Sequence, residues 1–184
     1  MKKKVGLVIL DGWGFGKKDS SDGIHLAKTP FFDSLLEKHP NSSLITYGEK
    51  VGLPRGQMGN SEVGHMNIGA GRIVFQDLLR IDNAIKDGSF FEEKQLLAAL
   101  NYAKENNKKV HLMGLVSKGG VHSSFSHLLA LCDLVHKHRI NKCFIHAFTD
   151  GRDCNPNSGV SYIKELETYI QKYSIKIASV VGRY

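Results

Sequence analysis

The sequence contains no long apolar run. None of its apolar stretches approaches the roughly 20 residues that a membrane-spanning helix needs. We therefore expect no membrane partner. The short run VGLVIL, residues 5–10, follows a basic tip, but it is too short for a signal peptide and no A-x-A-like site follows Asp11. We interpret it as a β-strand buried on both faces.

Cysteine is scarce. The three cysteines are an odd number and no two of them have the C-x-x-C spacing: Cys132, Cys143 and Cys154. This pattern predicts free, mostly buried thiols and a reducing, cytoplasmic location.

Basic residues do not form a stripe. The net charge is +7, but the lysines are scattered apart from Lys2–Lys4, and no basic segment is interleaved with aromatic residues. We therefore expect no nucleic-acid partner. A small anionic substrate explains a modest positive charge equally well. The content of 41% hydrophobic and 23% charged residues is that of a soluble globular protein.

Three common active-site motifs are also missing. Gly12, Gly14 and Gly16 would need a glycine at the position of Lys17 to form a dinucleotide fingerprint. The stretch 114–120 lacks the Gly-Lys-Ser/Thr ending of a P-loop. The spacing after Ser61 is one residue too long for a nucleophile elbow.

The elements that are present alternate between strand and helix, which predicts an α/β fold with a parallel sheet built from βα units. A helix begins at Thr29–Pro30, with Thr29 as its N-cap. Ser89 and Glu92 resemble a capping box for a helix that runs to about residue 106. The other expected strands are at 44–47, 110–116, 143–149 and 175–181, and a further helix is expected at about 76–86. Two more helices are expected from their apolar residues, one with Leu128, Leu131, Cys132 and Val135 and one with Val160, Ile163, Leu166 and Ile170.

Polar, glycine-rich loops follow the last three predicted strands. They carry His122, Arg152, Asp153 and Arg183. Because ligands bind beyond the carboxyl ends of the strands in open α/β sheets, we expect these side chains to share one rim of the sheet. Such a set suits a carboxylate or a phosphate.

Ser61, in the stretch GQMGNSEVGHMNIGAGR, allows two interpretations. A serine after Gly59-Asn60 and before a short helix is a good N-cap. The same helix start favours an anion, and a metal shared with Asp11 would activate the hydroxyl as a nucleophile. His65 comes one helical turn later and could contact the same place. Chemistry alone supports the cap and the nucleophile equally.

Five stretches resemble cofactor-independent phosphoglycerate mutase, of the alkaline phosphatase superfamily: LVILDGWG, GLPRGQMGNSEVGHMNIGAGR, SKGGVHSS, HAFTDGRD and SVVGRY. The resemblance runs from residue 5 to residue 184. It implies interconversion of 3-phosphoglycerate and 2-phosphoglycerate through a phosphoserine intermediate, with two Mn²⁺ ions. It implies that Ser61 is the nucleophile and a metal ligand, that Asp11 is a ligand of the same metal, and that His122, Arg152, Asp153 and Arg183 contact the substrate.

Members of this family are much longer than 184 residues. By the resemblance, residues 1–76 are the first piece of a phosphatase-like metal-binding domain, and residues 77–184 are the first part of an inserted transferase domain. The remaining metal ligands would lie beyond Tyr184. We therefore expect a fragment or a truncated gene product that is inactive alone, and a monomer when full length. The alternatives are a metal-dependent phosphomonoesterase or phosphopentomutase, or a non-catalytic fragment that binds an anion.

Overall fold

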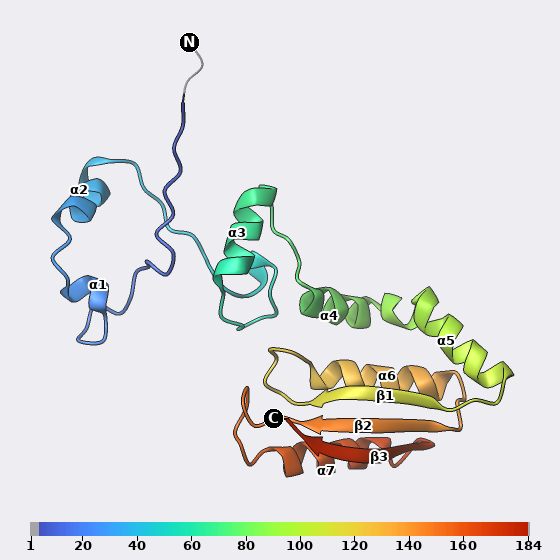
Figure 1. Ribbon diagram of the computed structural model, residues 1–184. Helices are drawn as coiled ribbons and strands as arrows, with labels where there is room; N and C mark the ends of the chain where they lie inside the picture. Colours follow the sequence, from blue (N-terminus) through green and yellow to red (C-terminus); the bar gives the residue numbers. More distant parts are fainter. Residues whose placement is uncertain (1–3, 184) are drawn as a thin grey trace.

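A parallel sheet forms the centre of the second half of the chain in the computed structural model, which describes residues 4–183. Its strand order is β1 (Val110–Val116), β2 (Cys143–Thr149) and β3 (Ile175–Gly182), as Figure 1 shows. The register places Val110 beside Cys143, and a bulge interrupts the pairing of β2 with β3 after Ile145. The α/β class and the three predicted strands are therefore confirmed.

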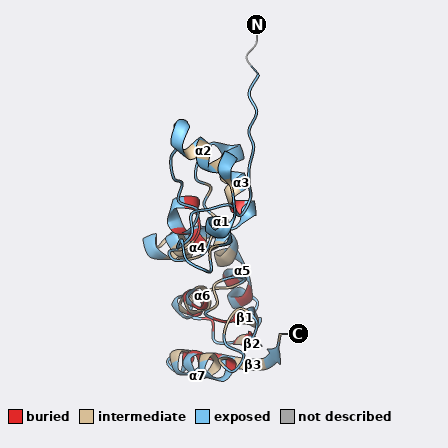
Figure 2. Ribbon diagram, turned by 90° about the vertical axis from the view of Figure 1, so that its left-hand side faces the viewer, coloured by how far each residue is buried: buried red, intermediate tan, exposed pale blue. Residues whose placement is uncertain are grey.

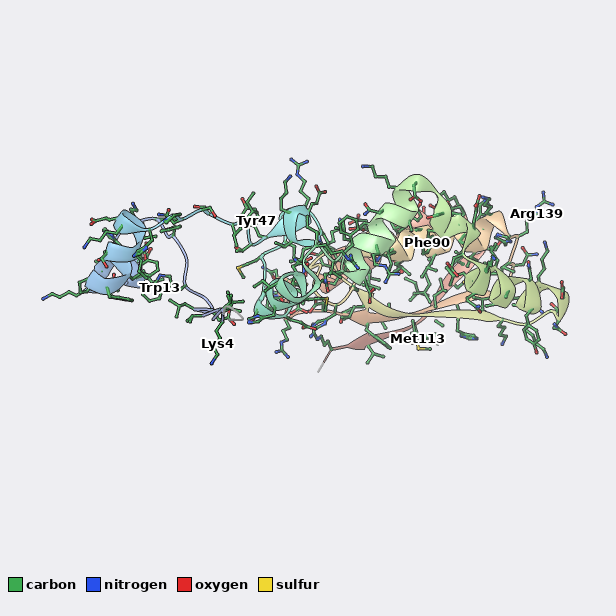
Figure 3. The ribbon with its side chains drawn as sticks, turned by 90° about the horizontal axis from the view of Figure 1, so that it is seen from above. Lys4, Trp13, Tyr47, Phe90, Met113 and Arg139 are labelled. Carbon is green, nitrogen blue, oxygen red and sulfur yellow. The ribbon has the colours of Figure 1, made fainter. Side chains whose placement is uncertain are left out.

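The helices between the strands, α6 (Phe125–Lys137) and α7 (Gly159–Ile170), cover the same face of the sheet (Figure 2). Between helices and sheet lies the main core, whose most deeply buried side chains are Val116, Cys132, Leu134, Val135, Cys143, Ile145 and Leu166. Within residues 4–183, no helix covers the opposite face (Figure 2). Met113 projects from it, away from the helices (Figure 3), and is 70% exposed.

The chain reaches this sheet through α4 (Asp77–Asp87), a short 3₁₀ helix η2 (Ser89–Glu92) and α5 (Lys94–Glu105). The capping box predicted at Ser89 and Glu92 is wrong. Gly88, with φ of 88°, turns the chain into the left-handed region and ends α4, so that Ser89 and Glu92 form the separate turn η2. The N-cap of α5 is Glu93, whose carboxylate accepts a hydrogen bond from the Gln95 backbone N–H.

The first part of the chain contains α1 (Gly23–Leu26), α2 (Pro30–Lys38), a 3₁₀ helix η1 (Gly48–Val51) and α3 (Ser61–Ala70). The helix predicted at Pro30 is confirmed, but Thr29 bonds to the Asp33 carboxylate rather than capping a backbone N–H. A small core of Val51, Leu53 and Val63 joins η1 to α3.

The strands predicted at residues 5–10 and 44–47 are wrong. Both segments are extended but unpaired; within residues 4–183 the sheet of β1, β2 and β3 offers neither of them a partner. Residues 5–10 run alone away from α3 (Figure 1), and Val5 and Val8 are 93% and 83% exposed. A buried parallel strand needs hydrogen-bonding neighbours and covered faces, and these residues have neither in the described chain.

The three cysteines are free, as expected. Cys132 and Cys143 are buried in the main core, and burial raises the pKa of Cys132 to about 12 and that of Cys143 to about 11. Cys154 is half-buried in the loop after β2. Among residues 4–183, no helix is long and apolar enough to cross a membrane.

A polar cluster joins α6 to the end of α7. The phenol hydroxyls of Tyr169 and Tyr173 both donate to the Asp133 carboxylate, at 2.8 and 2.6 Å. The His136 ring stacks on Tyr173 with 4.4 Å between ring centroids. Because hydrogen bonds to a charged acceptor are stronger than neutral ones, this cluster holds the two helices in register over the sheet.

We expect Asp133→Asn to lower the free energy of unfolding by roughly 1–3 kcal/mol, because two phenols lose their charged acceptor in a partly buried place. Urea denaturation of the variant measures this. The control is Asp77→Asn, which breaks an exposed i,i+3 ion pair with Arg80 and should cost less than about 0.5 kcal/mol. Equal midpoints for Asp133→Asn and the unsubstituted chain would contradict the role given to this cluster.

The same cluster predicts a loss of stability in alkali. Burial first, and then the hydrogen bond to Asp133, raise the pKa of Tyr169 and Tyr173 above the ordinary value of 10.0. Folded phenols therefore stay protonated where unfolded ones ionise. Their contribution is complete below about pH 10 and is lost as the pH rises through the higher folded pKa values.

Melting temperatures measured from pH 8 to pH 11 test this expectation. The Tyr169→Phe, Tyr173→Phe double variant should lose less stability between pH 9 and pH 11 than the unsubstituted chain does. Parallel pH profiles for the two proteins would show that these phenols do not titrate differently on unfolding.

Candidate active site

Ser61 is the first residue of α3, and the cap is its neighbour. The Asn60 side-chain oxygen accepts a hydrogen bond from the Val63 backbone N–H at 2.9 Å. The interpretation of Ser61 as the helix cap is therefore wrong, although the expected helix is present. Because Asn60 satisfies the backbone donor, the Ser61 hydroxyl is free to bond elsewhere.

The Ser61 hydroxyl donates to the Asp11 carboxylate, 50 residues earlier in the chain. The His65 ring nitrogen Nδ1 lies 3.2 Å from the same hydroxyl oxygen and 2.8 Å from the Ser61 carbonyl oxygen. Since a carbonyl oxygen only accepts, this contact places the proton on Nδ1. The structure thus brings Ser61 and Asp11 together, and places His65 against Ser61, the contact that the sequence left open.

Close backbone packing fixes the approach to α3. A Cβ on Gly59 would lie 1.7 Å from the Thr46 carbonyl oxygen, so only glycine fits there. Gly52 has φ of 86°, and a Cβ on it would lie 2.0 Å from the Val74 carbonyl oxygen. The Asn67 amide bonds to the backbone of Val51 and of Val74, at 2.9 and 2.8 Å. These contacts set where the N-terminus of α3 points.

The donor atoms at Ser61 suit a hard divalent cation in kind but not in number. A carboxylate oxygen and a hydroxyl oxygen are ligands that Mg²⁺ and Mn²⁺ prefer, usually in sets of six. Within residues 4–183 no group of three or more His, Cys, Asp or Glu side chains could hold a metal ion. Asp11 and Ser61 therefore offer two oxygen atoms of the kind that such a cation binds, fewer than a complete set.

A second cluster lies at the carboxyl ends of the strands. One Arg183 guanidinium nitrogen contacts the Asp153 carboxylate and lies 3.2 Å from an Asp150 oxygen. His122 Nε2 lies 3.9 Å from the same Asp153 oxygen. These ion pairs, the Asp153 bond first, raise the pKa of Arg183 above its usual value, so the guanidinium stays charged.

An open pocket of about 370 Å³ adjoins this cluster and is lined by Leu115, His122, Phe148, Gly182 and Arg183. Three of the four residues predicted for the rim, His122, Asp153 and Arg183, are thus close together. The fourth, Arg152, is on the same loop as Asp153. Its side chain is exposed and makes no hydrogen bond to any residue from 4 to 183.

Asp150 is the member of this cluster that the sequence did not single out. One carboxylate oxygen accepts from the backbone N–H groups of Gly151, Arg152 and Asp153, at 2.7, 3.0 and 3.2 Å. The other accepts from the Ser117 hydroxyl at 2.7 Å. These bonds, led by that from the Arg152 N–H, hold the Asp150 pKa well below its usual range. An aspartate at a strand end before Gly-Arg-Asp is the signal that could have revealed it.

Known proteins resemble the whole chain. A family model described as the N-terminus of BPG-independent phosphoglycerate mutase matches residues 81–184. The chain is 53% identical over 184 residues to the 2,3-bisphosphoglycerate-independent phosphoglycerate mutase of Parabacteroides distasonis, and 55% identical to that of Onion yellows phytoplasma. Each match covers 100% of this chain but only 36% and 35% of the relative.

A solved structure gives the same result. The chain is similar to Leishmania mexicana phosphoglycerate mutase, determined at low cobalt concentration, with a TM-score of 0.71 and 33% identity. The match covers 95% of this chain and 33% of that protein. The family model matches more than half of the residues, including the rim residues, and Ser61 and Asp11 lie outside that match but within the alignment with the Parabacteroides distasonis relative. The chain therefore belongs to the family of BPG-independent phosphoglycerate mutases, of which it spans about the first third.

Proposed function

We propose that the protein containing this chain interconverts 3-phosphoglycerate and 2-phosphoglycerate through a phosphoserine at Ser61, acting as a cytoplasmic monomer. The observation that carries the proposal is the pairing of the Ser61 hydroxyl with the Asp11 carboxylate at the start of α3. The N-terminus of a helix favours an incoming phosphate. A serine hydroxyl needs an activating neighbour to become reactive, and the Asp11 carboxylate is proposed as part of that neighbourhood. The names of the relatives supply phosphoglycerate as the substrate class.

The reaction is an intramolecular exchange in two balanced steps. Ser61 Oγ attacks the phosphorus, the bond between phosphorus and the glycerate 3-oxygen breaks, and the serine proton passes to that oxygen. The glycerate turns in the pocket. Its 2-hydroxyl then attacks the phosphoserine, the bond to Oγ breaks, and the proton of that hydroxyl returns to Ser61. No water enters and no net charge changes.

The metal requirement is proposed as two Mn²⁺ ions, one held in part by Asp11 and Ser61. Bound divalent cations lower the pKa of the hydroxyl and offset the negative charge of the phosphoryl group. Among this chain's own groups, Asp11 orients the hydroxyl through its hydrogen bond. His65 Nδ1–H lies 3.2 Å from the same oxygen and restricts its direction.

The rim residues are proposed to bind the rest of the substrate. Arg183 and Arg152 are the anion-binding groups, because a planar guanidinium matches carboxylate and phosphate oxygens. Asp153 can accept a hydrogen bond from a glycerate hydroxyl, and His122, whose side chain is 59% exposed, can donate to an oxygen. The substrate would bind in the pocket beside Arg183 and His122.

The division of the chain at residue 76 is also a proposal. Its support is that the family model begins at residue 81, and that the core of Val51, Leu53 and Val63 is separate from the main core. Residues 1–76 would then belong to the metal-binding domain and residues 77–184 to the substrate-binding domain.

In the complete protein, Ser61→Ala should abolish turnover and leave the fold intact, because Asn60, not Ser61, caps α3. A coupled assay with 3-phosphoglycerate and Mn²⁺ measures turnover, and circular dichroism checks the fold. The control is Ser161→Ala, which removes another exposed serine hydroxyl from the first turn of a helix. It should retain full activity. Substantial turnover by folded Ser61→Ala would refute the phosphoserine.

The same assay separates the alternatives. A phosphomonoesterase would release inorganic phosphate from 3-phosphoglycerate in place of forming 2-phosphoglycerate. A phosphopentomutase would instead act on a pentose phosphate. A protein that only binds anions would retain the substrate unchanged.

Residues 1–184 alone should have no mutase activity, because they provide one carboxylate and one serine towards sites for two ions. The test adds Mn²⁺ and 3-phosphoglycerate to the purified chain, verified by mass spectrometry to end at Tyr184, and looks for 2-phosphoglycerate. The complete protein at the same concentration is the positive control. Turnover by the short chain at a comparable rate would mean that a second ligand set exists or that two chains share one site.

A further inference from the structure

Asp150 is bonded to the loops after all three strands. Ser117, just after β1, donates to one carboxylate oxygen, and the loop after β2 donates to the other through three backbone N–H groups. Arg183, just after β3, donates to that second oxygen at 3.2 Å. Asp153 also reaches the loops after β1 and β3, through His122 at 3.9 Å and through Arg183, but the Asp150 contacts to the three loops are all within hydrogen-bond distance and its side chain is the more deeply buried of the two.

Burial separates Asp150 from its neighbour Asp153. The side chain of Asp150 is 2% exposed and that of Asp153 is 15% exposed, while both bond to the same Arg183 nitrogen. A substrate anion that approaches Arg183 from the pocket can displace Asp153. It cannot reach Asp150, which is covered by its own loop and by Ser117.

Asp150, the buried partner of Arg183, therefore has a role separate from that of Asp153. A guanidinium on a flexible side chain binds an anion well only when its donors are already aimed, because ordering it during binding costs affinity. Asp150 contacts the Arg183 guanidinium from the buried side, and its negative charge balances the positive charge of that group. The same carboxylate fixes the backbone of residues 151–153, and hence the positions of Arg152 and Asp153.

We infer that Asp150 is a positioning residue for phosphoglycerate binding, which aims Arg183 and fixes the loop of residues 151–153 without touching the substrate. This inference rests on the proposed function for its substrate, but the geometry at Arg183 can be tested independently. Ser117 contributes by donating a hydrogen bond to the Asp150 carboxylate oxygen that does not contact Arg183.

The experiment compares Asp150→Asn with the unsubstituted complete protein. The amide keeps the size of the carboxylate and one acceptor oxygen but removes the charge that faces Arg183. KM for 3-phosphoglycerate should rise at least about tenfold, with a smaller change in kcat, because an anchored binding group loses its direction. Asp133→Asn is the matched control. It removes a hydrogen-bonded carboxylate from the same half of the chain and should lower stability without changing KM.

A double-mutant cycle tests whether Asp150 acts through Arg183. In an Arg183→Lys background, Asp150→Asn should raise KM by a smaller factor than it does alone, because the guanidinium that it aims is already gone and only its hold on residues 151–153 remains to be lost. Ser117→Ala is a milder second variant if Asp150→Asn does not fold, and it should raise KM by about two- to threefold. An unchanged KM in these variants, or effects of Asp150→Asn and Arg183→Lys that simply add, would overturn the inference.

Nuclear magnetic resonance gives a readout that needs no turnover. The guanidinium signals of Arg183, assigned by their loss in Arg183→Lys, should broaden or shift in Asp150→Asn and stay in place in Asp133→Asn. Guanidinium signals that Asp150→Asn leaves unchanged would refute the positioning role. If the unsubstituted protein fails to convert 3-phosphoglycerate, the proposed function fails, while this measurement still decides the role of Asp150.

Discussion

Parallel pairing is the constraint on which the rim of this molecule depends. Because β1, β2 and β3 run in the same direction, the loops that follow them leave the sheet at the same edge (Figure 1). The bulge after Ile145 shifts the pairing of β2 with β3 by one residue. Before it, Cys143 is opposite Ile175; after it, Thr149 is opposite Gly182, one residue further than a regular ladder would give. That extra residue lets the Arg183 N–H reach the Thr149 carbonyl oxygen, at 3.0 Å.

The two halves of the candidate site are held by different forces. The rim is attached to a sheet with a continuous core behind it, from Val116 to Ile175. Ser61 is attached to a core of three residues and depends on close backbone contacts at Gly52 and Gly59. Its partner Asp11 follows an exposed, unpaired segment. The Ser61 hydroxyl therefore sits on the less extensively packed part of the described chain, and His122, Asp153 and Arg183 sit on the better packed part.

The sequence predicts most of the second half correctly because its signals there are local. The strands 110–116 and 143–149 are runs of apolar residues between glycine-rich loops, and their bounds agree with the structure. The prediction for residues 5–10 uses the same signal and is wrong. An apolar run shows that a segment needs covering, but its strand partners depend on residues far away in the chain.

For the site, residue types revealed the charged groups but not their geometry. Ser61 and Asp11 lie together, as the metal suggested between them requires, although they are 50 residues apart and the strand predicted before Asp11 is wrong. The cap was assigned one residue too late, since Asn60 and Ser61 are both good caps and only the backbone decides between them. Asp150 was missed because its importance comes from Ser117 and Arg183, each 33 residues away.

The distribution of the three thiols has a practical consequence for spectroscopy. Cys132 and Cys143 are buried with raised pKa values of about 12 and about 11, so at neutral pH neither offers a thiolate to an alkylating reagent. Cys154 is half-buried and directly follows Asp153. A fluorophore or fluorine tag applied to the native chain would therefore attach at Cys154 first, and would report on the loop next to Arg183 without any cysteine having to be removed.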